Sequence, residues 1–420
     1  MFIVLTIRYK KPISISNKSI YLTFASNMRL NKTFNIVAKT QQGLEPLLAK
    51  ELEQLGATNI EQHKRAVSFD GDLALLYKAN LCLRTALRIL IPIHRFEALN
   101  EHELYDGIQK LNWEDYLDVN GTLAIEASTN SDLFNHTQYI SQKTKDAIVD
   151  QFRDKYGARP SVNVNQPDLR LNLHIFQHQC ILSLDSSGES LHRRGYRAEG
   201  NLAPLNEVTA AALILHTGWN GQGVFMDCMC GSGTILIEAA MIAKNIPPNF
   251  MRKKFGFETW DNFDATLWEQ IKVDAMAAII ESKATFKGND AVFKVVEIAR
   301  NNARIAGLDN EIKLTNMRFE EQTPPTPENG GIVIMNPPYG ERIDIGEAAA
   351  FYKMMGDKFK KDFTGYDVWI LSSNKEALKK VGLAASKRLV VWNSQLECKF
   401  HKFEMYSGTK RKDIEIKDTY

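Results

Sequence analysis

Short apolar runs and helically spaced apolar residues fill the first hundred positions of the chain. Apolar residues recur every third or fourth position between Leu44 and Leu55, and Gly56 follows them as a helix stop. Further apolar runs predict strands at Phe34–Ala38, Ala66–Phe69 and Thr85–Phe96 and a helix at Asp72–Asn80. Short strands that alternate with helices predict a small α+β unit over residues 28–100.

Residues 101–187 have the pattern of a second α+β unit. The predicted elements are a helix at Leu104–Leu111, a strand at Thr122–Ser128, a long helix at Gln138–Tyr156, and strands at Leu169–Ile175 and Gln179–Leu184. Residues 188–204 follow as a linker that carries the basic run His192–Arg197.

Residues 205–405 read as one larger domain. Its predicted strands are Val224–Met226, Ile332–Met335 and Asp367–Ser372, and its predicted helices are Asn206–Thr217, Thr234–Ala243, Ile271–Ala284, Val292–Ile305 and Ala348–Phe359. Strands that alternate with helices require crossover connections, so the pattern predicts a parallel, doubly wound α/β sheet. Ligands of such sheets bind at the carboxyl ends of the strands.

The two ends of the chain stand apart from these units. Residues 1–27 hold four basic residues and no acidic one, and they are equally well explained as a poorly ordered leader or as a misassigned extension ahead of Met28. Residues 406–420 form a basic tail. The formal charge of the chain is +2, so we expect local basic patches, rather than overall charge, to hold a polyanionic partner.

Composition excludes several classes of protein. Hydrophobic residues make up 44% and charged residues 24% of the 420 positions, as in ordinary globular domains. No run approaches the roughly 18 apolar residues that a membrane helix needs. The five cysteines form no regular framework, and neither cysteines nor histidines have the spacing of metal ligands. We therefore expect a cytoplasmic protein with reduced thiols, no membrane segment and no metal.

A glycine-rich turn, Asp227–Gly233, follows the predicted strand Val224–Met226 and leads into a helix. Its two glycines let a ligand approach the backbone closely, because no Cβ atom intervenes. Asp290, at the end of a later strand, suits the two hydroxyls of a ribose. Position 236 is leucine, so the dinucleotide fingerprint is incomplete. The pattern favours a nucleoside-containing cofactor, and a tight turn without a ligand is the alternative.

The tetrapeptide Asn336-Pro337-Pro338-Tyr339 follows the apolar strand Ile332–Met335. The two prolines stiffen the turn and remove two backbone donors, so hydrogen-bond acceptors remain: the Asn336 side-chain oxygen and the Pro337 carbonyl. Acceptors of this kind hold the two hydrogens of a nucleobase amino group and aim its nitrogen at an electrophilic methyl group. Tyr339 offers a face for stacking an extruded base. The alternative is a plain turn at a strand end.

Several charged and aromatic residues allow two interpretations. Arg193, Arg194 and Arg197 could contact phosphates, but a solvated segment between domains explains them equally well. The run Arg252–Lys254 is a charged loop on the simplest interpretation. Arg342 could shape a base pocket or pair with the adjacent glutamate. We expect the three tryptophans of the last domain to lie in the core, namely Trp219, Trp260 and Trp268.

Together these motifs resemble the class I S-adenosylmethionine-dependent methyltransferases that modify exocyclic amino nitrogens. The sequence is most similar to the bacterial 23S ribosomal RNA guanine-N2 methyltransferases of the RlmL type. The resemblance covers residues Phe34 to His401 and rests on Arg194–Arg197, Ala203–Glu207, Asp227–Glu238, Gly256-Phe257 with Trp260, and Asn336–Arg342. It implies a doubly wound, Rossmann-like methyltransferase domain at 205–405, preceded by a ferredoxin-like unit at 28–100 and an RNA-binding THUMP domain at 101–187.

The resemblance also implies roles for individual residues. S-adenosylmethionine would be the cofactor, held by Asp227, Cys228, Gly231, Gly233, Asp290 and Asn206. The target guanine would be held by Asn336, Pro337, Pro338 and Tyr339, and the RNA by Arg193, Arg194, Arg197 and Arg342. Cys228 stands where many relatives have proline, and no acidic residue for the cofactor adenine is evident near Asn316–Arg318.

The expected activity is N2-methylation of a guanine in 23S ribosomal RNA, with that RNA or an assembling large ribosomal subunit as the partner. Three other functions remain open on the residues alone. They are guanine-N2 methylation of transfer RNA, N6-adenine or N4-cytosine methylation of DNA, and a non-catalytic role as an RNA-binding assembly factor. The same Asn-Pro-Pro-Tyr chemistry serves every amino group named here, so the motif does not choose among the bases.

Overall fold

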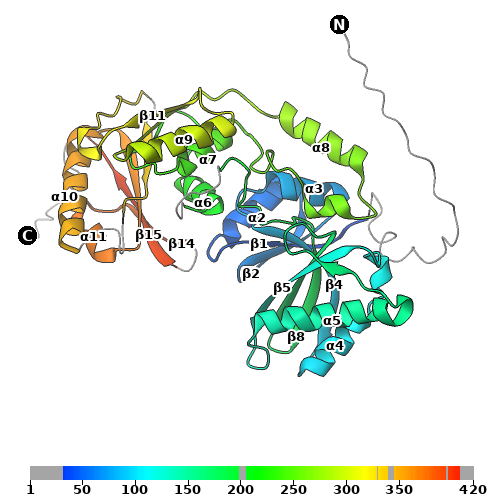
Figure 1. Cartoon of the computed structure of the whole chain (residues 1–420). Helices are drawn as coiled ribbons and strands as arrows, with labels where there is room; N and C mark the ends of the chain where they lie inside the picture. The colour runs from blue at the N-terminus through cyan, green and yellow to red at the C-terminus, as the bar shows by residue number, and fades with distance from the viewer. Residues whose placement is uncertain (1–31, 198–204, 329, 339–344, 394–395, 407–420) are drawn as a thin grey trace, which may run out of the picture.

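The computed structural model describes residues 32–197, 205–328, 330–338, 345–393 and 396–406. Tyr339 and Arg342 lie outside the described residues, as do the leader 1–27 and positions 407–420 of the basic tail. Two sheets organise the molecule, and they lie in different parts of the chain (Figure 1).

The front part of the chain forms one sheet of eight strands in the order β2-β3-β1-β4-β8-β7-β5-β6. The strands are β1 Phe34–Lys39, β2 Thr58–His63, β3 Ala66–Gly71, β4 Arg88–Glu97, β5 Thr122–Asn130, β6 Ser161–Val162, β7 Leu169–Phe176 and β8 Gln179–Asp185. The sequence pattern predicts two separate units here. Antiparallel pairing of the ten-residue β4 with β8 joins them into a single sheet.

Helices cover the apolar face of this sheet. They are α2 Glu45–Gln54, α3 Leu73–Cys82, α4 Glu101–Gln109 and α5 Thr137–Tyr156, with α4 and α5 packed together in Figure 1. In β7 the alternate residues Leu169, Leu171, Leu173 and Ile175 are buried in the core, as period-two patterning requires. The helix α5 ends where Gly157 adopts a left-handed conformation, with φ of 64°.

The back part forms a seven-stranded sheet in the order β11-β10-β9-β12-β13-β15-β14. The parallel strands are β9 Val224–Asp227, β10 Thr285–Asp290, β11 Ile312–Asn316, β12 Gly331–Met335 and β13 Tyr366–Ser372, and the antiparallel pair is β14 Lys387–Asn393 and β15 Leu396–Glu404. The strand order reverses between β9 and β12, and this switch point is where ligands of open α/β sheets bind.

Helices lie on both faces of the second sheet, as the doubly wound prediction requires. They are α6 Glu207–Thr217, α7 Thr234–Ala243, α9 Phe293–Ile305, α10 Ile345–Asp362 and α11 Lys375–Lys380. Adjacent residues of one strand enter different cores: Ile332 and Ile334 of β12 pack in one apolar cluster, whereas Val333 and Met335 pack in another. The sheet is therefore buried on both faces, which explains the uninterrupted apolar run in this strand.

One helix differs from its predicted position. The sequence pattern predicts a helix at Ile271–Ala284, but α8 spans Ala265–Ala277 and starts where Asp264 accepts a hydrogen bond from Leu267 N. The expected helix is therefore wrong by six residues at its start. Helix α8 packs against α3 of the front part (Figure 1).

The segment before α8 also belongs to the front core. The Phe257 ring stacks on Tyr77 with ring centroids 4.3 Å apart, and both side chains are fully buried. Trp260 and Trp268 are buried in the same cluster, as predicted, whereas Trp219 is only partly buried and packs on Phe225 at the edge of the back core. The segment before α8, which belongs to the back part of the chain, thus packs in the core of the front part.

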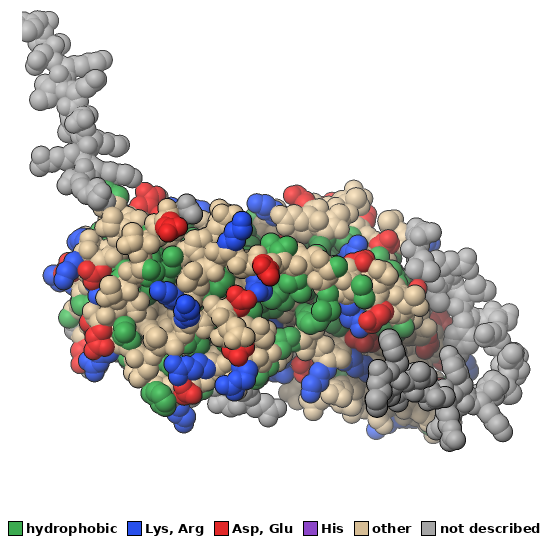
Figure 2. Space-filling model, turned by 90° about the horizontal axis from the view of Figure 1, so that it is seen from above, with side chains coloured by type: hydrophobic (Ala, Val, Ile, Leu, Met, Phe, Trp, Pro, Cys, Tyr) green, Lys and Arg blue, Asp and Glu red, His purple; other side chains and the backbone are tan. Residues whose placement is uncertain are grey.

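The described surface carries mixed charge. Lysine and arginine side chains are interspersed with aspartate and glutamate on the face in Figure 2. All five cysteines are free thiols. Within the described ranges, no helix is long and apolar enough to cross a membrane, and no group of three or more His, Cys, Asp or Glu side chains is arranged to hold a metal ion.

Candidate functional site

A cleft of about 2090 Å³ runs along the carboxyl ends of β9, β10 and β12. It continues past the linker at residues 188–197 to the loop between β6 and β7 of the front sheet. The predicted turn Asp227–Gly233, Asp290 and Asn336 all contribute to its wall. The structure therefore brings both sequence motifs to one cavity, at the switch point of the sheet.

The glycine-rich turn presents an open backbone surface. Gly231 and Gly233 have φ of 52° and 80°, in the left-handed region that favours glycine. A Cβ atom on Gly231 would meet nothing within 4 Å, so the space beside it is open, whereas a Cβ atom on Gly233 would lie 3.2 Å from Ala299 of α9. The first glycine leaves room for a ligand, and the second lets two helices pack closely.

Asp290 holds this turn in place. Its two carboxylate oxygens accept hydrogen bonds from Gly231 N at 3.1 Å and Val292 N at 3.0 Å. Each oxygen keeps a second lone pair, so the carboxylate still has capacity for hydroxyl donors of a ribose. Asn289, which no sequence motif marks, donates from Nδ2 to the Cys228 carbonyl at 3.0 Å and so holds the backbone of the turn at Cys228.

Asp227 is a buried carboxyl group at the end of β9. Its pKa is raised to about 8, mainly by burial, against a hydrogen bond from Met229 N that lowers it and with a smaller rise from the nearby Asp290 carboxylate. A carboxyl group with this pKa is largely protonated at neutral pH and becomes ionised when a cation binds beside it. The position therefore suits a ligand that carries an ammonium group.

The two cysteines of the glycine-rich turn, Cys228 and Cys230, carry no charge. Cys228 and Cys230 are buried in different cores, one on each face of the sheet. Burial raises the pKa of both thiols, so they stay neutral. Cys228 therefore contributes packing, and its carbonyl, to the site.

Asn336 ends β12 and faces the cleft. Its Oδ1 atom is buried and has no hydrogen-bond partner among the described residues. An unpaired buried acceptor is costly, so its presence in a cavity indicates a missing donor. Pro338 also lines the cleft, whereas Pro337 is buried and is not one of the lining residues. Tyr339 cannot be placed because it lies outside the described residues.

Arg194 does not have the role predicted for it. Its guanidinium is fully buried, where it donates to Leu191 O at 2.8 Å and Arg84 O at 2.6 Å and lies 3.5 Å from Glu238 Oε1. The same Glu238 oxygen accepts a hydrogen bond from the Tyr196 hydroxyl at 3.1 Å. A group enclosed in this way cannot reach an RNA phosphate, so the RNA-binding prediction for Arg194 is wrong.

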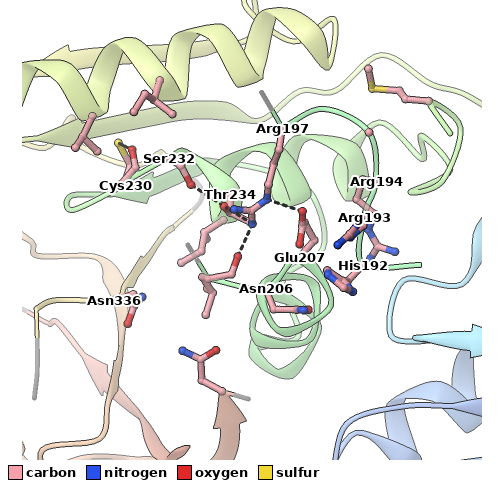
Figure 3. Close-up of a pocket in the computed structure, with 18 of the residues that line it drawn as sticks. His192, Arg193, Arg194, Arg197, Asn206, Glu207, Cys230, Ser232, Thr234 and Asn336 are labelled. Atoms are coloured by element: carbon pink, nitrogen blue, oxygen red, sulfur yellow. Dashed lines mark hydrogen bonds and ion pairs between the residues drawn. The ribbon is translucent and has the colours of Figure 1, made fainter. Parts of the chain in front are cut away.

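The neighbouring arginines have different surroundings. Arg193 is exposed at the rim of the cleft, where it pairs with Glu189 at 3.4 Å, and it remains a candidate for phosphate contact. Arg197 turns into the cleft and donates from Nε to Glu207 Oε1 at 2.5 Å (Figure 3). Asn206 caps α6 by accepting a hydrogen bond from Val208 N at 2.9 Å and also borders the cavity.

Arg252 is a structural residue rather than part of a solvated loop. It donates to four carbonyls in and just before the linker, those of Ser187, Glu189, Ser190 and Arg193, at 3.0–3.1 Å. Burial lowers its pKa to about 10, which still leaves it charged. Lys253 and Lys254 beside it are exposed, and they line the front end of the cleft together with Arg170.

Other wall residues escape prediction from the sequence. Arg318 and Glu320 line the cleft just after β11, close in sequence to the stretch where no adenine-contacting acid is evident. Phe351 of α10 also lines the cleft and adds an aromatic side chain to its wall. No motif marks these positions, because they come together only through the fold.

Family models match three successive parts of the chain. They are described as an RlmL ferredoxin-like domain at residues 35–90, a THUMP domain at 98–185, and an RMKL-like methyltransferase domain at 194–402. The predicted succession of a ferredoxin-like unit, a THUMP domain and a class I methyltransferase domain is confirmed.

Similar proteins agree with this assignment. The ribosomal RNA large subunit methyltransferase K/L of Syntrophotalea carbinolica is 39% identical over 378 residues, with 88% of this chain and 53% of that protein covered. The Synechocystis protein slr0064 is 40% identical, with 88% of this chain and 96% of that protein covered. A crystal structure of SMU.472 in complex with SAH has a TM-score of 0.81 at 33% identity, with 90% and 100% of the chains covered.

These similarities place the chain among the class I methyltransferases that carry a THUMP domain. It belongs to the RMKL-like methyltransferase family. S-adenosylmethionine is the cofactor of this domain. The open glycine turn, the Asp290 carboxylate beside it and the unpaired Asn336 acceptor are chemically suited to such a cofactor. The chain spans about half the length of the K/L relatives it matches.

Proposed function

We propose that this chain transfers a methyl group from S-adenosylmethionine to the N2 amino nitrogen of a guanine in 23S ribosomal RNA. The observation that carries the proposal is the buried Oδ1 atom of Asn336, which has no partner among the described residues and borders the same cleft as the glycine turn. Its missing donor is an amino hydrogen of the target base.

When bound, S-adenosylmethionine would supply a sulfonium methyl group: the base nitrogen would bond to the methyl carbon as its bond to sulfur breaks, S-adenosylhomocysteine would leave, and the amino proton would pass to solvent. Asn336 holds one amino hydrogen and so directs the nitrogen lone pair toward the cofactor end of the cleft. Pro338 stiffens the turn that carries the amide, and Phe351 provides an apolar wall. The contribution of these residues is positioning, which in favourable cases accounts for much of an enzymatic rate enhancement.

The front sheet supports an RNA substrate. The THUMP model matches residues 98–185, and the cleft continues from the methyltransferase domain to the β6–β7 loop of that domain. Arg193, Lys253 and Lys254 lie at this end of the cleft with exposed side chains, where they can contact phosphates. The choice of ribosomal RNA rests on the motifs of the linker and the last domain and on the name of the Syntrophotalea relative.

The test uses purified protein, cofactor with a labelled methyl group, and separate pools of 23S ribosomal RNA, transfer RNA and duplex DNA. We expect label in 23S ribosomal RNA alone, and N2-methylguanosine as the labelled nucleoside in mass spectrometry. Label only in transfer RNA would reject the ribosomal assignment, and methyladenine or methylcytosine in DNA would reject guanine. No label in any pool or in assembling large subunits, from protein that binds the cofactor, would favour a non-catalytic assembly factor.

A further inference from the structure

We propose that Arg197 binds the carboxylate at the methionine end of the cofactor. The proposal rests on the proposed function only in taking the cleft as the site of S-adenosylmethionine. It replaces the sequence-based expectation that Arg197 contacts RNA, and it adds a specific ligand to the residues of the glycine turn.

The guanidinium of Arg197 is fixed from two sides. Nε donates to Glu207 Oε1, and Nη2 donates to Leu205 O at 2.5 Å and to Thr234 Oγ1 at 3.2 Å. The remaining nitrogen, Nη1, is buried and has no partner among the described residues. A buried guanidinium nitrogen without a partner is poorly solvated, so Nη1 favours an anionic acceptor in the cleft.

The direction of the side chain agrees with a role in cofactor binding. Figure 3 shows Arg197 reaching from the linker toward Thr234 and Glu207, with Ser232 beside Thr234. Thr234 is the first residue of the ten-residue helix α7, directly after the glycine turn. The positive end of this helix dipole adds to the preference for an anion here. RNA phosphate is a poor candidate, because only 19% of the Arg197 side chain is exposed.

The cleft also contains the complementary group. The methionine end of the cofactor carries an ammonium and a carboxylate on one carbon atom, so a site for it needs an acceptor and a cationic donor. Asp227 at the end of β9 supplies a carboxyl group whose pKa suits a cation, and Arg197 supplies the donor. Both residues line the cleft: Asp227 begins the glycine turn, and Arg197 bonds to Thr234 directly after it.

Glu207 fixes the orientation of the Arg197 guanidinium, so that the site offers a directed donor and not only a positive charge. Burial raises the pKa of Glu207, and the Arg197 charge opposes that rise. The hydrogen bond from Arg197 Nε to Glu207 Oε1 holds the guanidinium plane in one orientation. Arginine can do this because its donors form a rigid fork, whereas lysine is a flexible point charge. The free edge of the fork is therefore preorganised for one carboxylate.

The test measures cofactor affinity without RNA, by titration calorimetry. The ligands are S-adenosylmethionine, S-adenosylhomocysteine and decarboxylated S-adenosylmethionine, which differs from the first only by the missing carboxylate. Wild-type protein should bind S-adenosylmethionine about 10- to 100-fold more tightly than the decarboxylated ligand, the range expected for a charge-assisted hydrogen bond. Arg197→Met should lose this preference while its affinity for the decarboxylated ligand stays unchanged. Arg197→Lys should keep only part of the preference.

Two controls separate ligand binding from folding. Arg300 also pairs with a glutamate and donates to a carbonyl but is not among the lining residues, so Arg300→Met should keep the full preference. The double variant Arg197→Met, Glu207→Gln removes the carboxylate that the single variant leaves buried, and it should bind like Arg197→Met. Thermal unfolding with no ligand present verifies that each variant is folded.

Two outcomes would overturn the proposal. Equal loss of affinity for both sulfonium ligands in Arg197→Met would make Arg197 a purely structural residue. If Arg197→Met left cofactor affinity unchanged and weakened RNA binding, Arg197 would be a phosphate-contacting residue, as expected from the sequence. Failure of the proposed function gives a different result, since a protein that methylates another nucleotide would still distinguish the ligand with a carboxylate from the one without it.

Discussion

At the scale of single residues, the buried carboxyl group of Asp227 predicts how the stability of the protein depends on pH. Its folded-state pKa of about 8 lies above the ordinary value of 3.8, so the folded protein binds a proton that the unfolded chain has released. The contribution of this group to stability is then lost as the pH rises from about 4 to about 8.

We therefore predict that Asp227→Asn unfolds at a higher temperature than wild type at pH 8, and that this difference shrinks as the pH falls toward 4. The amide keeps an oxygen to accept the hydrogen bond from Met229 N but has no charge to bury. Melting temperatures of both proteins across this pH range, without cofactor, check the prediction. A difference independent of pH would mean that the Asp227 carboxyl is not destabilised by its surroundings.

The sequence predicted the positions of site residues only where a glycine-rich turn or the end of a strand marks them. The turn Asp227–Gly233 and Asn336 could be found because spacing and strand ends locate them. Arg193 and Arg194 are adjacent in sequence, yet one is exposed and the other fully buried beside Glu238. Side-chain burial of this kind depends on contacts with residues far away in the chain, such as Arg84, and no local pattern encodes it.

At the scale of elements, the loop before α8 joins the two parts of the molecule. Phe257 is fully buried between Tyr77 of α3 and Trp268 of α8, with ring centroids 4.3 Å and 5.2 Å away. We predict that Phe257→Ala lowers the free energy of unfolding by about 3–5 kcal/mol, because it removes a large side chain from a packed core. Urea unfolding followed by tryptophan fluorescence measures this loss.

The matched control for this prediction is Phe176→Ala. The Phe176 side chain is 51% exposed at the end of β7, so its removal should change the free energy of unfolding by less than about 0.5 kcal/mol. A similar small effect for Phe257→Ala would show that the loop is not part of the front core.

The strands β9, β12 and β13 and the helices α6, α7, α9 and α10 of the back domain were predictable, whereas β11, β14, β15, α11 and the limits of α8 were not. Apolar residues continue past its end as far as Ile280, which extends the apparent helix toward residue 284. The true start is marked by Asp264, whose capping bond the pattern of apolar residues does not reveal. The strand β2 was missed because its side chains are mostly exposed, which leaves no apolar alternation to detect.

At the scale of the whole molecule, the two sheets are held together at a packed joint. Arg194, Arg252 and the loop before α8 all bond or pack across it. The sequence shows only a linker at this joint, because the contacts across it are made by residues far apart in the chain, such as Arg84 and Arg194. The front sheet is therefore set in place relative to the cleft before any RNA binds.

The exposed cations at the front end of the cleft should control RNA affinity through salt. Arg193, Lys253 and Lys254 line the cleft, and all three side chains are exposed. Replacing all three by glutamine should weaken RNA binding and flatten the dependence of log affinity on log salt by about 0.7 to 0.9 for each phosphate that the protein no longer neutralises. Cofactor affinity should not change.

Filter binding across a series of salt concentrations gives this slope for the wild type and for the triple variant. A matched triple variant of cations that do not line the cleft, Lys353→Gln, Lys360→Gln and Lys379→Gln on α10 and α11, serves as the control. Equal slopes for the two variants would show that RNA takes another path over the protein.

The most direct test of the account is the rate of methyl transfer to 23S ribosomal RNA by Asn336→Ala, measured with saturating cofactor. Asn220→Ala, in an exposed turn outside the cleft, is the control. We predict a loss of about 100-fold or more for Asn336→Ala, by analogy with the removal of one preorganised hydrogen-bonding group from an active site, with cofactor and RNA affinities retained. A folded Asn336→Ala protein that methylates at the wild-type rate would contradict the account.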